Sequence, residues 1–517
     1  MYKSLCSHLL RIPCCRRSAK PPWALSQLRS FTMSGSRPKY QTLAELHQAY
    51  QGGKTVKEVT EQYLDIIESS KDLNATTVVN HKALEEAQQL DELAQEQRGP
   101  LFGLPIVVKD QIETAGIATA YGSKVCKNHV PSQDATLVRK LKDAGAVILA
   151  KTTMPDWAAS WFSTSSLSET TKHPIDNSRD PGGSSSGSGT AVAAGLALAA
   201  IGGDTGGSIR LPASFCGLVG VRVTPGRISR DGMSSLVVTQ DTPGPMTRTV
   251  EDAARILDCL VGFDEKDDFT SINALRHETE PQSFVDAIKE PVLSGRRLGV
   301  LRQAFGEHKG INSALDKTLS ELQASGVELI DVEIPDLEQL KEQTSVYVLR
   351  SRSDINSFLA SRDGLQHLKI EDLQEKGDYH QCLDLISALA KGPKDPFQSP
   401  HFSKALSAIQ HFQRTVMSLY AKHKLDAIIY PTCQLLAPKT QDLLDLRWTC
   451  LNYPTNTVIA SQLLWSAVSV PMGTAKDDEY PDDPELPVGL EILGLPMSED
   501  KLLNLAAGIE AMKEAKS

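Results

Sequence analysis

The sequence predicts an α/β fold, in which helices cover a β-sheet. Two observations carry this prediction. From Leu101 onward, short apolar runs typical of buried strands alternate with helical patterns. Several of these runs end in a polar residue, and open α/β sheets place their reactive groups at the carboxyl ends of strands. With 40% hydrophobic and 23% charged residues, the composition is that of a soluble globular enzyme.

Helical patterns come first along the chain. Apolar residues recur at helical spacing over 43–50 and again over 56–67, and Thr55 is placed to cap the second helix. A polar helix is predicted over 82–97.

Strands and helices then alternate. Strands are predicted over 106–108, 146–150, 219–223 and 298–301, and helices over 136–144 and 250–260. The first two strands end in Lys109 and Lys151. Further strands over 427–430, 468–470 and 490–493 return the chain to the sheet.

These elements indicate one domain over 41–517, with a core over 100–262 and a C-terminal return over 426–517. Between about 335 and 425 the chain is helical and charged, without chemical motifs. We interpret this segment as an insertion that shapes the substrate pocket, together with the segment around 452–465.

The first 40 residues are basic and lack acidic side chains, since the first carboxylate is Glu45. This composition is typical of a mitochondrial transit peptide ending near Phe31, or of a disordered extension ahead of a start at Met33. We therefore expect a cytoplasmic or mitochondrial protein. The whole chain has a net charge of −10, so the part after these basic residues is more negative still. We therefore expect no direct nucleic-acid partner.

The sequence indicates neither a membrane-spanning protein nor a metal-binding one. The apolar run over 191–201 is too short for a membrane span, which needs roughly 20 residues. None of the nine cysteines forms a C-x-x-C pair or has zinc-ligand spacing to a histidine, so we expect no metal and no cofactor. Cys216, in an apolar segment, is interpreted as a packing residue.

Two glycine-serine clusters carry the strongest chemical signal. They read GGSSSGSG at 182–189 and GGDTGGSIR at 202–210, and we interpret the apolar run 191–201 between them as part of one short helix. Glycine lets backbone N–H groups converge on one point, as an oxyanion hole requires.

The residues of these clusters leave three chemistries open. Residues 183–187 match the G-x-S-x-G nucleophile elbow, but no apolar strand precedes them. The second is a phosphate-binding loop, but neither cluster has the Gly-Lys-Ser/Thr ending that such a loop requires. The third is a serine nucleophile with a lysine base: His173 is the one histidine near the clusters, whereas Lys109 ends an apolar run where burial would lower its pKa.

The sequence resembles the amidase signature family. The matching stretches are FGLPIVVKD at 102–110, GGSSSGSGTAVAAG at 182–195, DTGGSIRLPASFCGLVG at 204–220, TPGRISRDG at 224–232, DTPGPMTRTVEDAA at 241–254 and PVGLEILG at 487–494. The resemblance implies a single large α/β/α sandwich around a mixed β-sheet.

The resemblance also implies a Ser–cis-Ser–Lys triad. Ser208 takes the nucleophile position, Ser184 the proton-relay position after a cis peptide bond, and Lys109 the general-base position. The implied oxyanion hole consists of backbone N–H groups of Thr205, Gly206, Gly207 and Ser208. Asp204 and Arg210 are expected to brace the loop, and the residues expected at the substrate are Ser184, Asp204, Thr205 and Ser123.

The implied activity is hydrolysis of a carboxamide C–N bond through an acyl-enzyme. One alternative is the glutamine-hydrolysing A subunit of glutamyl-tRNA amidotransferase, which passes ammonia to a partner; another is a non-catalytic binding module. The family commonly has a Lys-Pro-Thr stretch where this chain reads RVTP at 222–225, and DTPGPM at 241–246 looks more like stand-alone amidases. Both departures favour a free-standing amidase acting on a small-molecule amide. We keep a homodimer open as the oligomeric state.

Overall fold

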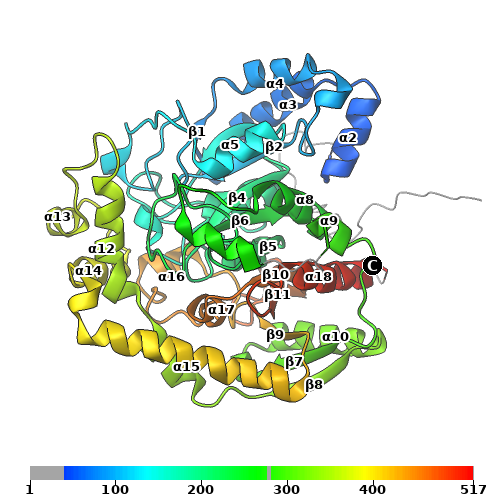
Figure 1. Cartoon of the computed structure of the whole chain (residues 1–517), viewed down its shortest axis with the longest axis vertical. Helices are drawn as coiled ribbons and strands as arrows, with labels where there is room; N and C mark the ends of the chain where they lie inside the picture. Colours follow the sequence, from blue (N-terminus) through cyan, green and yellow to red (C-terminus); the bar gives the residue numbers. More distant parts are fainter. Residues whose placement is uncertain (1–39, 276–280, 516–517) are drawn as a thin grey trace, which may run out of the picture.

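A single mixed sheet runs through the molecule (Figure 1). The computed structural model describes residues 40–275 and 281–515. Within them, 11 strands are arranged in the order β1-β3-β2-β4-β6-β5-β10-β11-β9-β7-β8. The predicted α/β class with a mixed sheet is confirmed, since parallel and antiparallel pairs both occur.

The first six strands of this order come from the N-terminal half of the chain, and β4 contains the first residues of the second cluster. They are β1 (Thr76–Val79), β3 (Val147–Thr152), β2 (Pro105–Lys109), β4 (Ala199–Asp204), β6 (Thr242–Thr247) and β5 (Val219–Arg222). Strand β2 pairs in parallel with β3 and β4, and it is buried at every position. Its last residue, Lys109, therefore emerges from the interior of the sheet.

The remaining strands complete the sheet from the C-terminal part of the chain. They are β10 (Ala467–Ala475), β11 (Leu486–Leu493), β9 (Ala427–Pro431), β7 (Arg297–Leu301) and β8 (Glu328–Val332). The antiparallel pair of β5 and β10 joins the two parts, with Val221 opposite Val468.

The first two helices form where the sequence predicts them. Helix α2 (Leu43–Gln51) is followed by α3 (Val56–Ser69), whose N-cap Thr55 forms a capping box with Glu58. The polar helix predicted over 82–97 is shorter in the structure, where α4 covers Ala83–Asp91. Helices α5 (Thr136–Asp143), α8 (Val250–Leu260) and α18 (Glu499–Glu514) pack against the sheet.

The segment between the two clusters corrects one expectation. It is not one helix: α6 (Ser186–Ala194) ends at Gly195, and the chain then forms strand β4. Gly195 has a φ of 85°, the left-handed conformation that ends helices and that glycine adopts without strain. The following apolar residues pair with β2 and β6 instead of continuing the helix.

Three further strands escaped prediction for local reasons. Strand β1 has four residues, and β8 is a largely exposed edge strand without a clear alternating pattern. Strand β6 contains Pro243 and Pro245, residues that argue against a central strand because they cannot donate ladder hydrogen bonds.

Helices fill the segment between β8 and β9. They are α11 (Leu337–Thr344), α12 (Tyr347–Ala360), α13 (Ile370–Lys376), α14 (Asp384–Ala390) and α15 (Pro400–His423), and Figure 1 shows α12–α14 at one side and α15 along the bottom. Side chains of α12–α15 pack with Tyr121 and Trp157 in a hydrophobic cluster separate from the main core. The helical segment therefore packs against the loops that follow β2 and β3.

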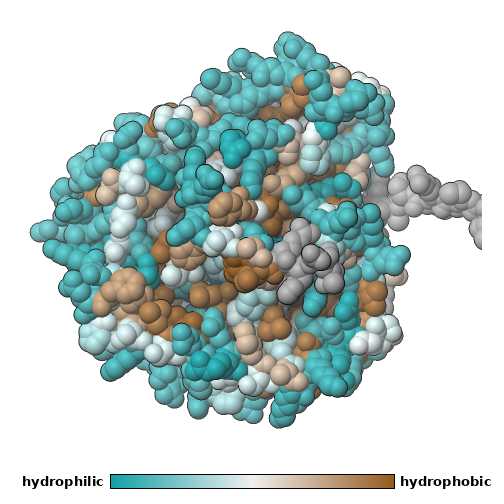
Figure 2. Space-filling view, in the orientation of Figure 1, coloured by the Kyte–Doolittle hydropathy of each residue, from teal (hydrophilic) through white to brown (hydrophobic). Residues whose placement is uncertain are grey.

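The surface in this view is mostly hydrophilic, with hydrophobic patches near its centre (Figure 2). Among the helices of the described residues, none has the length and apolar character needed to cross a membrane.

Candidate active site

Lys109 and Ser184 are in direct contact inside the protein. Lys109 Nζ donates to Ser184 Oγ at 2.8 Å and to the Gly203 carbonyl at 3.2 Å. Burial lowers the pKa of Lys109 to about 7, although the carboxylates of Asp204 and Asp241 oppose the shift. A substantial fraction of this lysine is therefore neutral near pH 7 and able to accept a proton.

The two clusters meet at their serines. Ser184 follows a cis peptide bond with Gly183, the conformation that the family resemblance implied. The next N–H group, of Ser185, donates to the Ser208 carbonyl at 3.1 Å. Ser208 lines a cavity, and its carbonyl is bonded to the residue that follows Ser184.

The loop over 204–208 supplies the candidate oxyanion hole, with one correction. The N–H group of Gly207 donates to Asp204 Oδ1 at 2.9 Å and is not free to bind a substrate oxygen. The N–H groups of Thr205, Gly206 and Ser208 form no hydrogen bond within the described residues. These three N–H groups are the candidates that remain.

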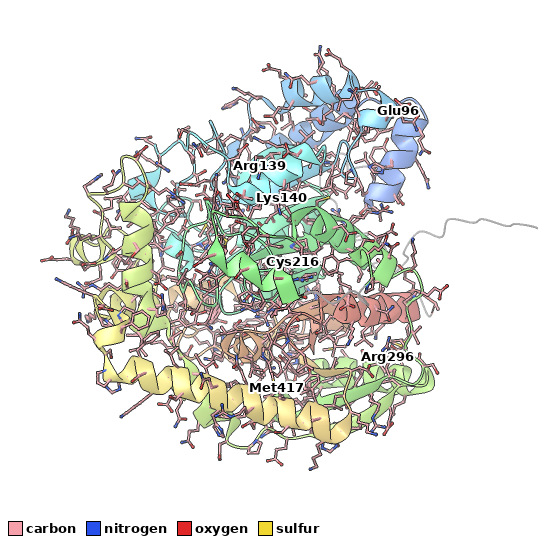
Figure 3. The ribbon with its side chains drawn as sticks, in the orientation of Figure 1. Glu96, Arg139, Lys140, Cys216, Arg296 and Met417 are labelled. Atoms are coloured by element: carbon pink, nitrogen blue, oxygen red, sulfur yellow. The ribbon has the colours of Figure 1, made fainter. Side chains whose placement is uncertain are left out.

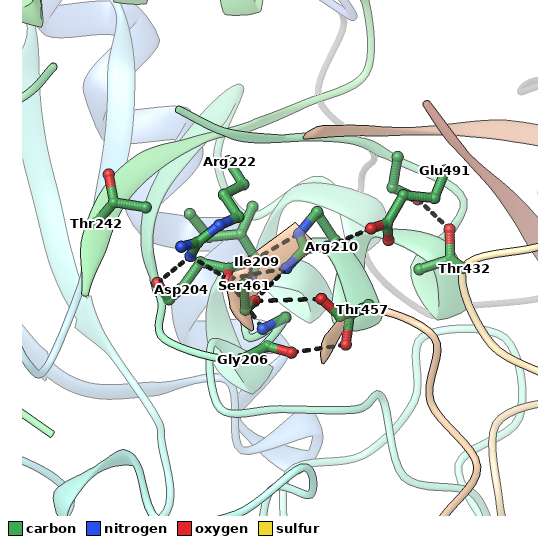
Figure 4. A network of polar contacts seen from close by, with 12 residues as sticks. Asp204, Gly206, Ile209, Arg210, Arg222, Thr242, Thr432, Thr457, Ser461 and Glu491 are labelled. Atoms are coloured by element: carbon green, nitrogen blue, oxygen red, sulfur yellow. Dashed lines mark hydrogen bonds and ion pairs between the residues drawn. The ribbon is translucent and has the colours of Figure 1, made fainter. Parts of the chain in front are cut away.

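Asp204 sits at the centre of a buried ionic network (Figure 4). Its carboxylate pairs with Arg210 at 3.1 Å and Arg222 at 2.8 Å. Burial would raise the pKa of Asp204, yet the two guanidinium groups hold it below its usual value. Arg210 also pairs with Glu491 on β11 and donates to Ser461 Oγ at 2.8 Å.

This network changes the expected role of Asp204 and Thr205. Asp204 has no exposed surface, and its carboxylate accepts N–H groups of the loop as well as both arginines. The Thr205 hydroxyl donates to Asp241 Oδ1 at 2.6 Å, and burial raises the pKa of Asp241 to about 6. Both side chains brace the loop instead of lining the cavity, and Arg210 braces it as expected.

The cavity has a volume of about 600 Å³. Among the described residues, Ser208 lines this cavity, whereas Ser184, Asp204, Thr205 and Ser123 do not. Aromatic and carboxamide side chains form much of the remaining wall: Trp161, Phe305, Tyr347, Tyr453, Gln303, Gln434, Gln462 and Asn452. Two charged residues in the lining, Glu338 and Lys341, pair with each other at 2.7 Å. The helical segment and the 452–465 segment therefore both contribute walls, as the sequence suggested.

Two residues near the clusters prove structural. Cys216, labelled near the middle of the view in Figure 3, is only 5% exposed. Burial raises the pKa of its thiol, so it is not a nucleophile. His173 is fully buried with its Nε2 bonded to the Phe215 carbonyl, and burial lowers its pKa to about 4. In the described part of the chain, no group of three or more His, Cys, Asp or Glu side chains could hold a metal ion.

Sequence reasoning missed Arg222, Asp241, Thr457 and Glu491 as parts of the site. Glu491 carried a signal, since it is a lone carboxylate within the apolar run of residues 488–493. Arg222 and Asp241 lie in matched or nearly matched motifs, but their partners come from other elements. Thr457 carried no local signal.

Comparison with known proteins supports the class that this site defines. The family model described as Amidase matches residues 58–503, so the chain belongs to the amidase family. It is an amidase-signature amidohydrolase that acts on amide C–N bonds.

Among its relatives, the A subunit of glutamyl-tRNA(Gln) amidotransferase from Desulfatibacillum aliphaticivorans is 35% identical over 87% of this chain and 92% of its own length. The native peptide amidase of Stenotrophomonas maltophilia superposes with a TM-score of 0.80 at 29% identity, over 92% of this chain and 97% of that one. For the same amidotransferase component from Thermotoga maritima, the TM-score is 0.68 at 27% identity, over 88% of this chain and 91% of that one.

Proposed function

We propose that this protein is a free-standing amidase in which Ser208 is the nucleophile, Ser184 the proton relay and Lys109 the general base. The observation that carries the proposal is the buried contact of 2.8 Å between Lys109 Nζ and Ser184 Oγ, beside a cavity that Ser208 lines. All three triad positions are filled, which argues against a non-catalytic binding module.

The proposed reaction begins with attack of Ser208 Oγ on the substrate carbonyl carbon. The Ser208 proton passes to Ser184 Oγ while the Ser184 proton passes to neutral Lys109 Nζ. The developing oxyanion is stabilised by the free N–H groups of the 204–208 loop. As the C–N bond breaks, the same route returns a proton to the leaving nitrogen, and water then hydrolyses the acyl ester on Ser208.

The cavity favours an amide whose acyl group carries no charge. Glu338 and Lys341 neutralise each other, and the rest of the described lining is aromatic, aliphatic or uncharged polar. A charged acyl group would lose hydration without gaining a free counter-ion. Aliphatic, aromatic and C-terminal peptide amides fit this description, and peptide amidase is the activity named for one structural relative.

The alternative is a glutamine-hydrolysing component of an amidotransferase. The names of the sequence relatives favour it. Glutamine carries both an ammonium and a carboxylate, so in this chain it would have to compete for Glu338 and Lys341, which already form an ion pair.

A substrate panel separates the two proposals. Ammonia release from the purified chain would be measured with propionamide, benzamide, a C-terminal peptide amide and glutamine. We expect the uncharged amides to be turned over and glutamine to be poor. Glutamine turnover that exceeds the others and rises when the partner chains of an amidotransferase are added would contradict the free-standing amidase.

The cytoplasmic or mitochondrial location and the homodimer remain proposals. Residues 1–39 lie outside the described residues. Imaging of a fusion of residues 1–40 to a fluorescent protein tests the mitochondrial location, and light scattering of the purified chain tests the dimer.

A further inference from the structure

Thr457 contacts the 204–208 loop from a distant part of the chain. It directly precedes α17 (Val458–Leu463), and its hydroxyl donates to the Gly206 carbonyl at 2.7 Å in a buried setting (Figure 4). The two residues are 251 positions apart in sequence. None of the proposed triad chemistry uses this contact.

The contact fixes one peptide group from both sides. Thr457 binds the carbonyl of the Gly206–Gly207 peptide, and Asp204 Oδ1 binds its N–H group at 2.9 Å. A peptide group is planar, so two bonds on opposite sides set its orientation. Without them, two adjacent glycines would have the widest choice of backbone conformations.

The orientation of this peptide controls its neighbours. The free N–H groups of Gly206 and Ser208 belong to the peptide groups immediately before and after it. Each is separated from it by the φ and ψ angles of one glycine. A clamp on the central peptide therefore aims both candidate oxyanion donors.

Thr457 is itself held in place. The side-chain amide of neighbouring Asn456 donates to the carbonyls of Ala304 and Pro431, both at 2.7 Å. Ser461 Oγ donates to the Thr457 carbonyl at 3.2 Å and accepts from Arg210, so the clamp joins the buried ionic network. A Cβ atom at Gly207 would lie 1.9 Å from Thr457 Oγ1, so the loop and the threonine are packed without spare room.

We propose that Thr457 is a positioning residue: its hydroxyl holds the Gly206–Gly207 peptide so that the N–H groups of Gly206 and Ser208 face the substrate oxygen in the transition state. This inference rests on the proposed assignment of Ser208 as nucleophile. Thr457 does not line the cavity, although its hydroxyl also pairs at 2.8 Å with that of Thr455, which does. We therefore expect its main effect on the chemical step.

The test compares Thr457→Val, which keeps the shape and removes the donor, with Thr457→Ser, which keeps the donor. We expect Thr457→Val to lower kcat by about 10- to 100-fold with KM nearly unchanged, the scale of a misplaced oxyanion donor. Thr457→Ser should recover most of the activity.

Thr247→Val is the matched control. It removes the hydroxyl of an equally buried threonine, which donates to the Thr249 carbonyl at 2.7 Å at the end of β6 opposite to Asp204. We expect it to lower the melting temperature without changing kcat. If Thr457→Val is insoluble, Thr457→Ala makes the same comparison.

Three results would overturn the inference: wild-type kcat in Thr457→Val, no recovery in Thr457→Ser, or an equal loss of kcat in Thr247→Val. A fluorophosphonate probe keeps this separate from the nucleophile assignment. If the probe fails to label Ser208 in active wild-type protein, the proposed function fails whatever Thr457 does. If it labels wild-type Ser208 quickly and Thr457→Val slowly, both assignments stand.

Discussion

The signature region over 100–262 and the helical segment over 337–423 meet at one cavity but are built differently. In the signature region, Lys109, Ser184 and Asp204 are fully buried and bonded to neighbours from several strands. In the helical segment, cavity residues include Val348, which is 43% exposed, and Glu338, whose side chain is 78% exposed.

This difference separates the residues of the chemical step from those that recognise the substrate. Burial is what lowers the pKa of Lys109, so the reactive groups have to lie within the core. A substrate must enter and leave, so the cavity wall has to include exposed side chains. We therefore expect substitutions in the first region to affect kcat and those in the second to affect KM.

The largest effect is expected from Ser208→Ala. Loss of the nucleophile should lower kcat by about 10⁴-fold or more, as in other serine hydrolases, with the protein folded. Ammonia release and circular dichroism check this. Ser186→Ala is the matched control, because the buried Ser186 hydroxyl has no hydrogen-bond partner in the described structure and should be dispensable. Equal losses in the two variants would contradict the assignment.

The next effect concerns Lys109 and pH. Lys109 accepts a proton only when neutral, and its pKa is about 7, so kcat/KM should fall about tenfold per pH unit below that value and level off above it. Lys109→Met should lower kcat by about 10³-fold or more at every pH, since it removes the base. A measured pH profile that stays flat from pH 8 to pH 5 in the wild type would exclude Lys109 as the base.

A smaller effect, on stability, is expected from the ionic network. Glu491→Leu removes one of the two carboxylates that pair with buried Arg210 and should cost about 3 kcal/mol of unfolding free energy. Glu491→Gln keeps a hydrogen-bond acceptor and should cost less. Urea unfolding measures both, and a Glu491→Leu variant as stable as wild type would show that the network is not needed for folding.

The smallest effect is expected at the cavity rim. Val348→Ser replaces an exposed apolar residue of the helical segment that lines the cavity, so KM for an apolar amide should rise about two- to fivefold with kcat unchanged. Steady-state kinetics with propionamide and benzamide test this. A loss of kcat at the rim would erase the contrast between the two regions.

Much of this site could be predicted because its residues lie in local motifs. Lys109 ends a strand that its own apolar run predicts, and Ser184 and Ser208 lie in glycine-rich turns. The predicted helix over 250–260 has the bounds found for α8, because its cap and apolar spacing are local. Strand β4 was not predicted, because its short apolar sequence also suits a helix and its partners β2 and β6 decided the outcome.

The sequence by itself determined the α/β class, the family and the residues of the proposed triad, since these depend on residue types at short spacings. The tertiary structure alone decided which groups are free to act. It engages the Gly207 N–H group and the Asp204 carboxylate within the loop, places Glu491 on Arg210, and brings Thr457 to Gly206. The Asp204–Gly207 contact spans only three residues. The other two contacts join residues 281 and 251 positions apart, so spacing along the chain does not encode them and only the folded sheet brings them together.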